Sequence, residues 1–155
     1  MSLTIGDAAP DFTLPASGGR TVSLAGLKGK PFVLYFYPRA DTPGCTKEAC
    51  AFQEALPQLG ATGVTVIGIS KDSLKAIDKF AEKFSLTFPL ASDPQTTTIA
   101  AYGAWVKKSM YGREYMGIER STVLVDSKGK IARIWPKVKV PGHAADVLKA
   151  VQALA

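Results

Sequence analysis

Two long apolar segments dominate the hydrophobic pattern of the chain. Lys30–Tyr37 and Val64–Ser70 are rich in β-branched and aromatic side chains, and each predicts a buried strand. Four shorter strands are predicted at 21–24, 88–91, 121–126 and 130–135, the last two joined as an antiparallel hairpin by a Ser-Lys-Gly turn. These segments together predict a central sheet.

Apolar residues that recur every three or four positions predict amphipathic helices between these strands. The first helix begins at Cys45 and carries Ala49, Phe52 and Leu59 on one face. Pro57 lies inside this pattern and predicts that the helix kinks or ends near Leu56. Three further helices are predicted at about 74–84, 92–102 and 143–154. The glycine- and aromatic-rich residues 103–117 give no clear prediction.

The order of these elements predicts one α/β domain over residues 1–155, because no linker, repeat or low-complexity segment divides the chain. Helical crossovers allow parallel strands, whereas the hairpin adds antiparallel ones, so we expect a mixed central sheet flanked by helices. A strand, a cysteine-bearing loop and a helix near the start of such a domain are typical of a thioredoxin-like fold.

The charge of the chain does little to suggest a nucleic-acid or membrane partner. The formal net charge is +6, but the basic residues form short, separated groups, and they do not interleave with aromatic residues as a nucleic-acid platform requires. No apolar segment approaches the roughly 20 residues that span a bilayer. We also recognise no signal peptide, so we expect a cytoplasmic protein without a nucleic-acid or membrane partner.

Histidine and cysteine are so scarce that they limit the possible chemistry. His143 is the single histidine, and Cys45 and Cys50 are the two cysteines. Sites built from several histidines or from four thiolates are therefore excluded. Because the cytosol keeps thiols reduced, a structural disulfide is not expected. The cysteines are either inert core residues or redox-active ones, and we interpret His143 as a surface residue.

Cys45 lies where the loop after the first long strand passes into a helix. The first turn of a helix has free backbone N–H groups and the positive end of the helix dipole, which favour a thiolate over a thiol. Gly44 lets the backbone approach a ligand closely, and the Thr42 hydroxyl is able to point at the sulfur or at a bound oxygen. The alternative is a small buried residue beside a Thr42 helix cap.

Cys50 follows five residues after Cys45. In one regular helix this spacing places the two Cα atoms roughly 8.7 Å apart, whereas a disulfide requires less than about 7 Å. A catalytic pair would therefore require residues near 43–52 to unwind. A structural disulfide would mean that the helix prediction is wrong. A reduced pair without a redox role is the third option.

The segment Pro38-Arg-Ala-Asp-Thr42-Pro-Gly-Cys45 resembles the active-site motif of the peroxiredoxins. Its continuation to Cys50 is similar to the PrxQ class, also called bacterioferritin comigratory protein, in which a resolving cysteine often lies five residues after the peroxidatic one. The resemblance extends to residues 6–14, 64–70 and 117–126, and so covers nearly the whole chain.

This resemblance implies a thiol-dependent peroxidase for hydrogen peroxide and organic hydroperoxides. Cys45 would attack the peroxide and become a sulfenic acid, and Cys50 would resolve it as an intramolecular disulfide. Thioredoxin or a similar dithiol would then reduce this disulfide. No metal, flavin or haem cofactor is implied, and proteins of this class are often monomers.

The resemblance also implies roles for the surroundings of Cys45. Thr42 would hydrogen-bond the peroxide together with the backbone N–H groups of Gly44 and Cys45. Pro38 would shield the sulfur from water, and Arg120 would place its guanidinium beside the thiolate. A fixed positive charge there would also stabilise the negative charge on the departing oxygen.

Alternatives remain at this point. Arg39 is a second candidate for the guanidinium, although a loop surface charge is the simpler interpretation, and Arg120 could instead pair with Glu119 or Asp126. A thioredoxin-like protein disulfide oxidoreductase is the alternative function, but the missing Cys-x-x-Cys spacing argues against it. A basic nucleic-acid-binding module with incidental cysteines is the third hypothesis, which a binding titration at two salt concentrations tests.

Overall fold

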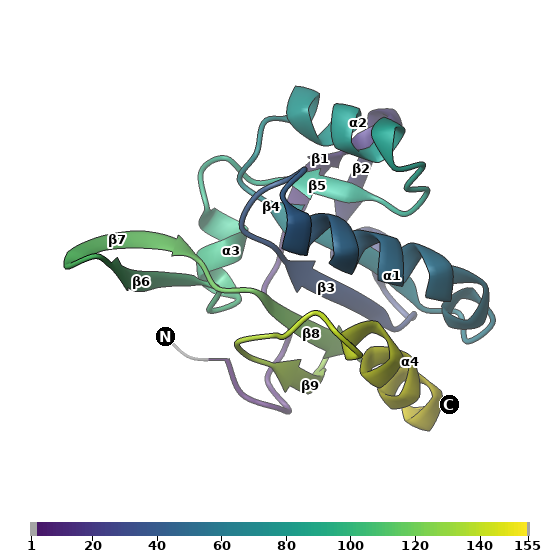
Figure 1. Cartoon of the computed structure of the whole chain (residues 1–155). Coiled ribbons are helices and arrows are strands. Elements are labelled where there is room, and N and C mark those ends of the chain that lie inside the picture. Colours follow the sequence, from purple (N-terminus) through teal and green to yellow (C-terminus); the bar gives the residue numbers. More distant parts are fainter. Residues whose placement is uncertain (1–2, 155) are drawn as a thin grey trace.

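A seven-stranded mixed sheet forms the centre of the computed structural model, which describes residues 3–154 (Figure 1). Its strand order is β2-β1-β5-β4-β3-β8-β9, and a separate two-stranded sheet contains β6 and β7. The strands are β1 (Thr13–Ala16), β2 (Arg20–Ser23), β3 (Phe32–Phe36), β4 (Thr65–Ser70), β5 (Leu90–Ser92), β6 (Trp105–Met110), β7 (Arg113–Ile118), β8 (Ser121–Val125) and β9 (Ile131–Trp135). β3, β4 and β5 are parallel, whereas β1, β2, β8 and β9 pair antiparallel.

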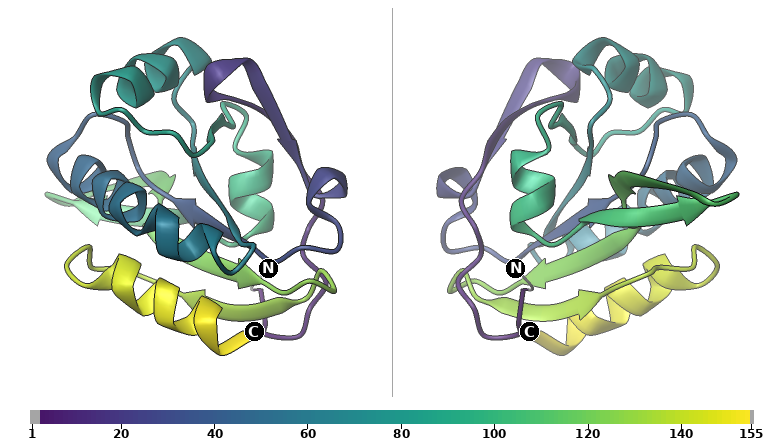
Figure 2. Two further views of the ribbon diagram at one scale, coloured as in Figure 1. Left: turned by 90° about the vertical axis from the view of Figure 1, so that its right-hand side faces the viewer. Right: turned by 90° about the vertical axis from the view of Figure 1, so that its left-hand side faces the viewer.

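Helices cover both faces of this sheet (Figure 2). The α-helices are α1 (Pro43–Gly60), α2 (Leu74–Lys83), α3 (Thr97–Ala101) and α4 (His143–Leu154), and the short 3₁₀ helices are η1 (Ser17–Gly19) and η2 (Ala25–Leu27). One hydrophobic core joins α1, α2 and α4 to one face of the sheet, and a second core joins α3 and the N-terminal segment to the other face. The predicted mixed α/β architecture is therefore confirmed.

Alternate residues of β3 supply these two cores, because successive side chains of a strand point to opposite faces. Tyr35 points towards α1, where its ring stacks on Phe52 with ring centroids 4.8 Å apart. A Cβ atom on Gly68 of the neighbouring strand would lie 2.7 Å from the Tyr35 ring. Glycine in the middle of β4 thus leaves the space that this aromatic pair under α1 requires.

The ends of two helices differ from the sequence predictions. α1 does not end near Leu56 but continues through Pro57 to Gly60. Pro57 is exposed, and near the C-terminus of a helix its missing N–H leaves only the Gln53 carbonyl without a helical donor. α3 is shorter than predicted and begins at Thr97, because its N-cap residue Thr96 adopts a left-handed backbone with φ of 61°.

Two strand features lay outside the sequence predictions. β1 contains Pro15, and proline argues against a strand in a sequence pattern. β1 nevertheless pairs with β2 and β5. The ambiguous segment 103–117 forms most of the β6–β7 hairpin, which extends away from the main sheet (Figure 1).

Among residues 3–154, no helix is both long enough and apolar enough to cross a membrane.

Candidate active site

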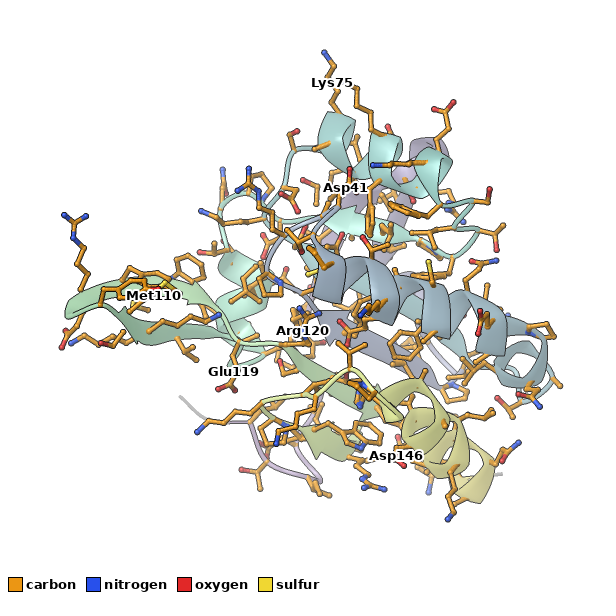
Figure 3. All side chains as sticks on the ribbon, viewed as in Figure 1. Asp41, Lys75, Met110, Glu119, Arg120 and Asp146 are labelled. Carbon is orange, nitrogen blue, oxygen red and sulfur yellow. The ribbon has the colours of Figure 1, made fainter. Side chains whose placement is uncertain are left out.

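The pairing of β3 with β8 brings together two segments that are far apart in the sequence. Phe36 at the end of β3 lies opposite Ser121 at the start of the antiparallel strand β8. The chain leaves β3 towards the N-terminus of α1, and Arg120 immediately precedes β8. Figure 3 shows Arg120 where the β6–β7 hairpin meets β8, beside the N-terminal end of α1. Cys45 and Arg120 therefore meet although 75 positions separate them.

Cys45 is the third residue of α1 and is only 1% exposed. The Arg120 Nη2 atom donates a hydrogen bond to the Cys45 Sγ atom across 3.3 Å. A Cβ atom on Gly44 would lie 3.1 Å from the same Nη2 atom, so the missing side chain of Gly44 makes room for the guanidinium. Arg120 does not pair with Glu119 or Asp126, the partners considered from the sequence, but with Glu48.

Thr42 occupies the N-cap position of α1, but its side chain does not cap the helix. Its hydroxyl instead donates to the Arg39 carbonyl across 2.8 Å, which leaves the lone pairs of its oxygen available as acceptors. The first intrahelical bond runs from the Thr46 N–H to the Thr42 carbonyl. The N–H groups of Gly44 and Cys45 precede it and have no helical acceptor, which leaves them able to bind an oxygen.

The loop between β3 and α1 contains the other residues that were considered from the sequence. Pro38 is half-buried two residues after the end of β3, and Arg39 is exposed on the surface. The Ala40 N–H donates to the Asp72 carboxylate across 2.7 Å, which fixes the loop to the segment that precedes α2. Asp41 adopts a left-handed backbone with φ of 59° and forms an ion pair with Lys83 of α2 at 3.0 Å.

Glu48 is a site residue that the sequence reasoning missed. Its carboxylate is 1% exposed, and its Oε1 atom accepts a hydrogen bond from the Arg120 Nη1 atom across 2.7 Å. Burial raises the pKa of Glu48 to about 7, although Arg120 partly offsets this effect. Burial also lowers the pKa of Arg120, but Glu48 and Cys45 more than compensate and raise it. The guanidinium therefore stays charged between the two acids.

A sequence signal for Glu48 did exist. It lies three residues after Cys45 and one before Ala49, so it shares the face of α1 that Cys45, Ala49 and Phe52 bury. A carboxylate on the apolar face of a predicted helix is almost always paired. Its partner lies 72 positions away, which the helix pattern alone does not indicate.

Cys50 lies on α1 with Cys45, and both cysteines are free thiols. Cys45 is buried, whereas Cys50 is half-buried. The unbroken helix between them implies a Cα separation of about 8.7 Å. The two sulfurs are not within bonding geometry while α1 is folded, because a disulfide requires less than about 7 Å between Cα atoms.

The interpretation of His143 as a surface residue was wrong. His143 is 5% exposed at the start of α4, where its Nε2 atom shares a hydrogen bond of 2.7 Å with the Thr122 hydroxyl. Its ring packs edge-on against Phe52 and Trp135. Burial lowers the pKa of His143 to about 4. This histidine thus links α4 to α1 and β8 in its neutral form.

Neutral burial of His143 makes the stability of the fold depend on pH. The ordinary pKa near 6.5 applies to the unfolded chain, so the unfolded state binds more protons than the folded state between that value and about 4. We expect the full contribution of His143 to the free energy of unfolding above pH 6.5. This free energy should fall by roughly 2–3 kcal/mol as the pH falls to 4, because protons then bind preferentially to the unfolded chain. Urea unfolding from pH 7 to pH 4 measures this loss, and in His143→Gln the slope should decrease. An equal slope in both proteins would contradict the assignment.

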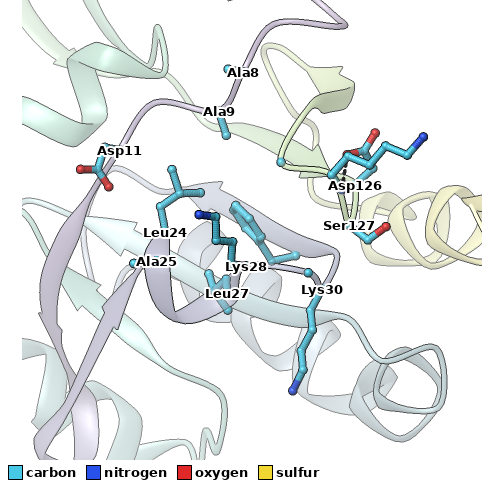
Figure 4. A pocket seen from close by; sticks show the side chains of 14 residues that line it. Ala8, Ala9, Asp11, Leu24, Ala25, Leu27, Lys28, Lys30, Asp126 and Ser127 are labelled. Carbon is cyan, nitrogen blue, oxygen red and sulfur yellow. Dashed lines mark hydrogen bonds between the residues drawn. The ribbon is translucent and has the colours of Figure 1, made fainter.

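A cavity of about 510 Å³ lies at the beginning of β3, the end of this strand that is away from Cys45 (Figure 4). It is bounded by η2, the turn between β8 and β9, and the segment around Ala8. Phe32 at the start of β3 lines it, whereas Cys45 follows the end of that strand, so the cavity does not belong to the cysteine site.

Within the described chain, no group of three or more His, Cys, Asp or Glu residues is placed to hold a metal ion.

Comparison with known proteins identifies the family to which this site belongs. The model of the AhpC/TSA family matches residues 5–134. A putative peroxiredoxin bcp of Coxiella burnetii is 53% identical over 148 residues, which cover 96% of this chain and 98% of the relative. The chain belongs to the peroxiredoxins of the AhpC/TSA family.

Solved structures place this peroxiredoxin in the Bcp/PrxQ class. A PrxQ variant of Xylella fastidiosa has a TM-score of 0.93 at 38% identity and covers 99% of this chain and 98% of its own. The bacterioferritin comigratory protein of Xanthomonas campestris has a TM-score of 0.88 at 41% identity, with coverages of 92% and 90%. The predicted thioredoxin-like fold and the predicted class are both confirmed, and this peroxiredoxin acts on peroxides.

Proposed function

We propose that this peroxiredoxin reduces hydrogen peroxide and organic hydroperoxides through Cys45, and that Cys50 resolves the product as an intramolecular disulfide. The observation that carries the proposal is the 3.3 Å hydrogen bond from the Arg120 guanidinium to the Cys45 sulfur at the start of α1. The similar Xanthomonas campestris protein, whose alkyl peroxide reduction activity has been studied structurally, supports organic hydroperoxides as substrates.

In the first step, the Cys45 thiolate attacks the terminal oxygen of the hydroperoxide. A sulfur–oxygen bond forms, the oxygen–oxygen bond breaks, and the departing alkoxide takes up a proton to leave as an alcohol, or as water from hydrogen peroxide. The free N–H groups of Gly44 and Cys45 hold the peroxide oxygens, and Arg120 stabilises the developing negative charge. Because the Thr42 hydroxyl already donates its proton to the Arg39 backbone carbonyl, the Thr42 oxygen accepts a hydrogen bond from the peroxide O–H. Pro38 keeps water from the sulfur.

In the second step, the Cys50 thiol condenses with the Cys45 sulfenic acid, which releases water and forms the disulfide. The helical separation of about 8.7 Å between the two Cα atoms prevents this reaction while α1 is intact. Residues near 43–52 must therefore unwind first. Unwinding also separates Cys45 from Arg120. The contact that promotes attack on the peroxide is therefore lost before the disulfide with Cys50 forms.

Thioredoxin or a similar dithiol then reduces the disulfide by thiol–disulfide exchange. Both cysteines lie in one chain, so the cycle requires no second copy, and we infer that a monomer completes it. Dependence on a dithiol reductant also fits a reducing compartment such as the cytoplasm.

The coupled reaction with thioredoxin, thioredoxin reductase and NADPH tests this cycle. We expect Cys50→Ser to consume about one equivalent of hydrogen peroxide per chain and then to lose turnover, because the sulfenic acid lacks its resolving partner. NADPH absorbance measures turnover, and mass spectrometry measures the first oxidation. Full turnover by Cys50→Ser would show that the reductant attacks the sulfenic acid directly, whereas insulin reduction by the unmodified protein would favour a disulfide oxidoreductase.

A further inference from the structure

The Arg120 guanidinium lies between two acidic groups that are both buried. Its Nη2 atom donates to the Cys45 sulfur across 3.3 Å, and its Nη1 atom donates to Glu48 Oε1 across 2.7 Å. The second carboxylate oxygen of Glu48, Oε2, is buried without a hydrogen-bond partner among the described residues. One cation thus faces two groups that each become negative when they lose a proton.

The other titratable groups around this cluster add no charge. Tyr35 and Tyr37 face it from β3, and burial raises the pKa of each well above its ordinary value. His143 faces Arg120 from α4, and burial lowers its pKa to about 4. All three side chains are therefore neutral near pH 7. Arg120 is then the one positive charge that faces Cys45 and Glu48 among the described residues.

Ionisation of both acids would leave one uncompensated negative charge in a buried site. Such a charge is costly because burial removes the hydration of an ion, and groups in this situation retain a proton instead. A proton on either Cys45 or Glu48 makes the cluster neutral.

We propose that Cys45 and Glu48 hold a single proton between them across Arg120, and that Glu48 carries this proton whenever Cys45 is a thiolate. The unpartnered Oε2 atom is the position at which the proton resides. Burial raises the pKa of Glu48 to about 7, with Arg120 opposing the shift, so this carboxyl is able to exchange its proton near neutral pH.

This arrangement supplies the proton that peroxide reduction consumes. The thiolate attacks the hydroperoxide and becomes a neutral sulfenic acid, and the oxygen–oxygen bond breaks to release an alkoxide. Glu48 then ionises, since Arg120 no longer faces a second anion, and the alkoxide leaves as an alcohol. One proton is lost by the carboxyl and one is gained by the alkoxide, so the charge of the site is unchanged. This step rests on the proposed peroxidase function, whereas the sharing of the proton does not.

Alkylation of Cys45 tests the proton count without any peroxide chemistry. In a Cys50→Ser background, iodoacetamide is added in weakly buffered solution near pH 8, with a pH indicator to count protons. Burial and Arg120 set the pKa of Glu48 at about 7 beside an uncharged Cys45. In the proposed pair, the negative charge of the thiolate raises this pKa further, so Glu48 keeps its proton at pH 8 until Cys45 is alkylated. We expect close to one proton per alkylated Cys45, because the sulfur loses its charge and Glu48 ionises. We expect close to none from Glu48→Gln, in which the thiolate alone pairs with Arg120.

Glu54→Gln is the matched control, because Glu54 is an exposed carboxylate on the same helix. It should release one proton, as the Cys50→Ser parent does. An infrared difference spectrum of the same reaction should show the loss of a protonated carboxyl band, and Glu48→Gln should lack this loss. Absence of proton release from the parent would mean that both acids are already ionised and would overturn the proposal. Equal release from Glu48→Gln would place the proton on the sulfur regardless of Glu48 and would also overturn it.

Discussion

Replacement of Cys45 by serine is expected to reduce peroxide consumption to the uncatalysed rate. The serine hydroxyl is almost the same size as the thiol, but it is a far weaker acid and provides no anionic nucleophile beside Arg120. Cys50 alone cannot substitute, because the hydrogen bond from Arg120 is made to Cys45. Loss of peroxide, followed directly in a single addition to the reduced protein, measures the effect.

Cys50→Ser is the matched control for Cys45→Ser, since it removes the other thiol of the same helix. It should still consume peroxide in the first oxidation. If Cys45→Ser consumed peroxide as fast as the unmodified protein, and Cys50→Ser did not, the roles of the two cysteines would be reversed.

Replacement of Arg120 by methionine is expected to slow the oxidation of Cys45 by about 10²- to 10³-fold, the loss typical when one donor to a developing negative charge is removed. The same change leaves Glu48 buried without its cation. A buried carboxylate without its cation, or the proton that it takes up instead near pH 7, costs roughly 3–5 kcal/mol of stability. Stopped-flow oxidation measures the rate, and urea unfolding measures the free energy of unfolding.

A double variant separates these two consequences of losing Arg120. Arg120→Met combined with Glu48→Gln removes both charges, so we expect stability to recover while the oxidation rate stays low. Arg113→Met, on the exposed part of β7, is the control and should change neither quantity. If the double variant regained the rate together with the stability, Arg120 would act on the fold and not on the sulfur.

The cysteine pair and its loop could be predicted because they lie close together in the sequence. The eight residues from Pro38 to Cys45 contain the motif, and their position between a buried strand and a helix follows from the hydrophobic pattern. The spacing of Cys45 and Cys50 also predicted that a folded helix keeps them apart, and both lie on α1 as free thiols.

Contacts between distant segments could not be predicted in the same way. The ion pair of Arg120 with Glu48 depends on the antiparallel pairing of β3 with β8, and the pattern of either strand does not specify its neighbour. His143 was interpreted as a surface residue because it follows Gly142 at the start of a helix and lies far from Cys45 in the sequence, yet α4 packs it against Phe52. Pro57 does not end α1, and Leu59 beyond it packs into the hydrophobic core.

Addition of one equivalent of hydrogen peroxide to the reduced protein tests the proposed cycle most directly. We predict that both thiols disappear, that the mass of the single chain falls by two hydrogen atoms, and that peptide mapping finds Cys45 joined to Cys50. Retention of one thiol with the gain of one oxygen atom, or a disulfide between two chains, would contradict an intramolecular cycle in which α1 unwinds.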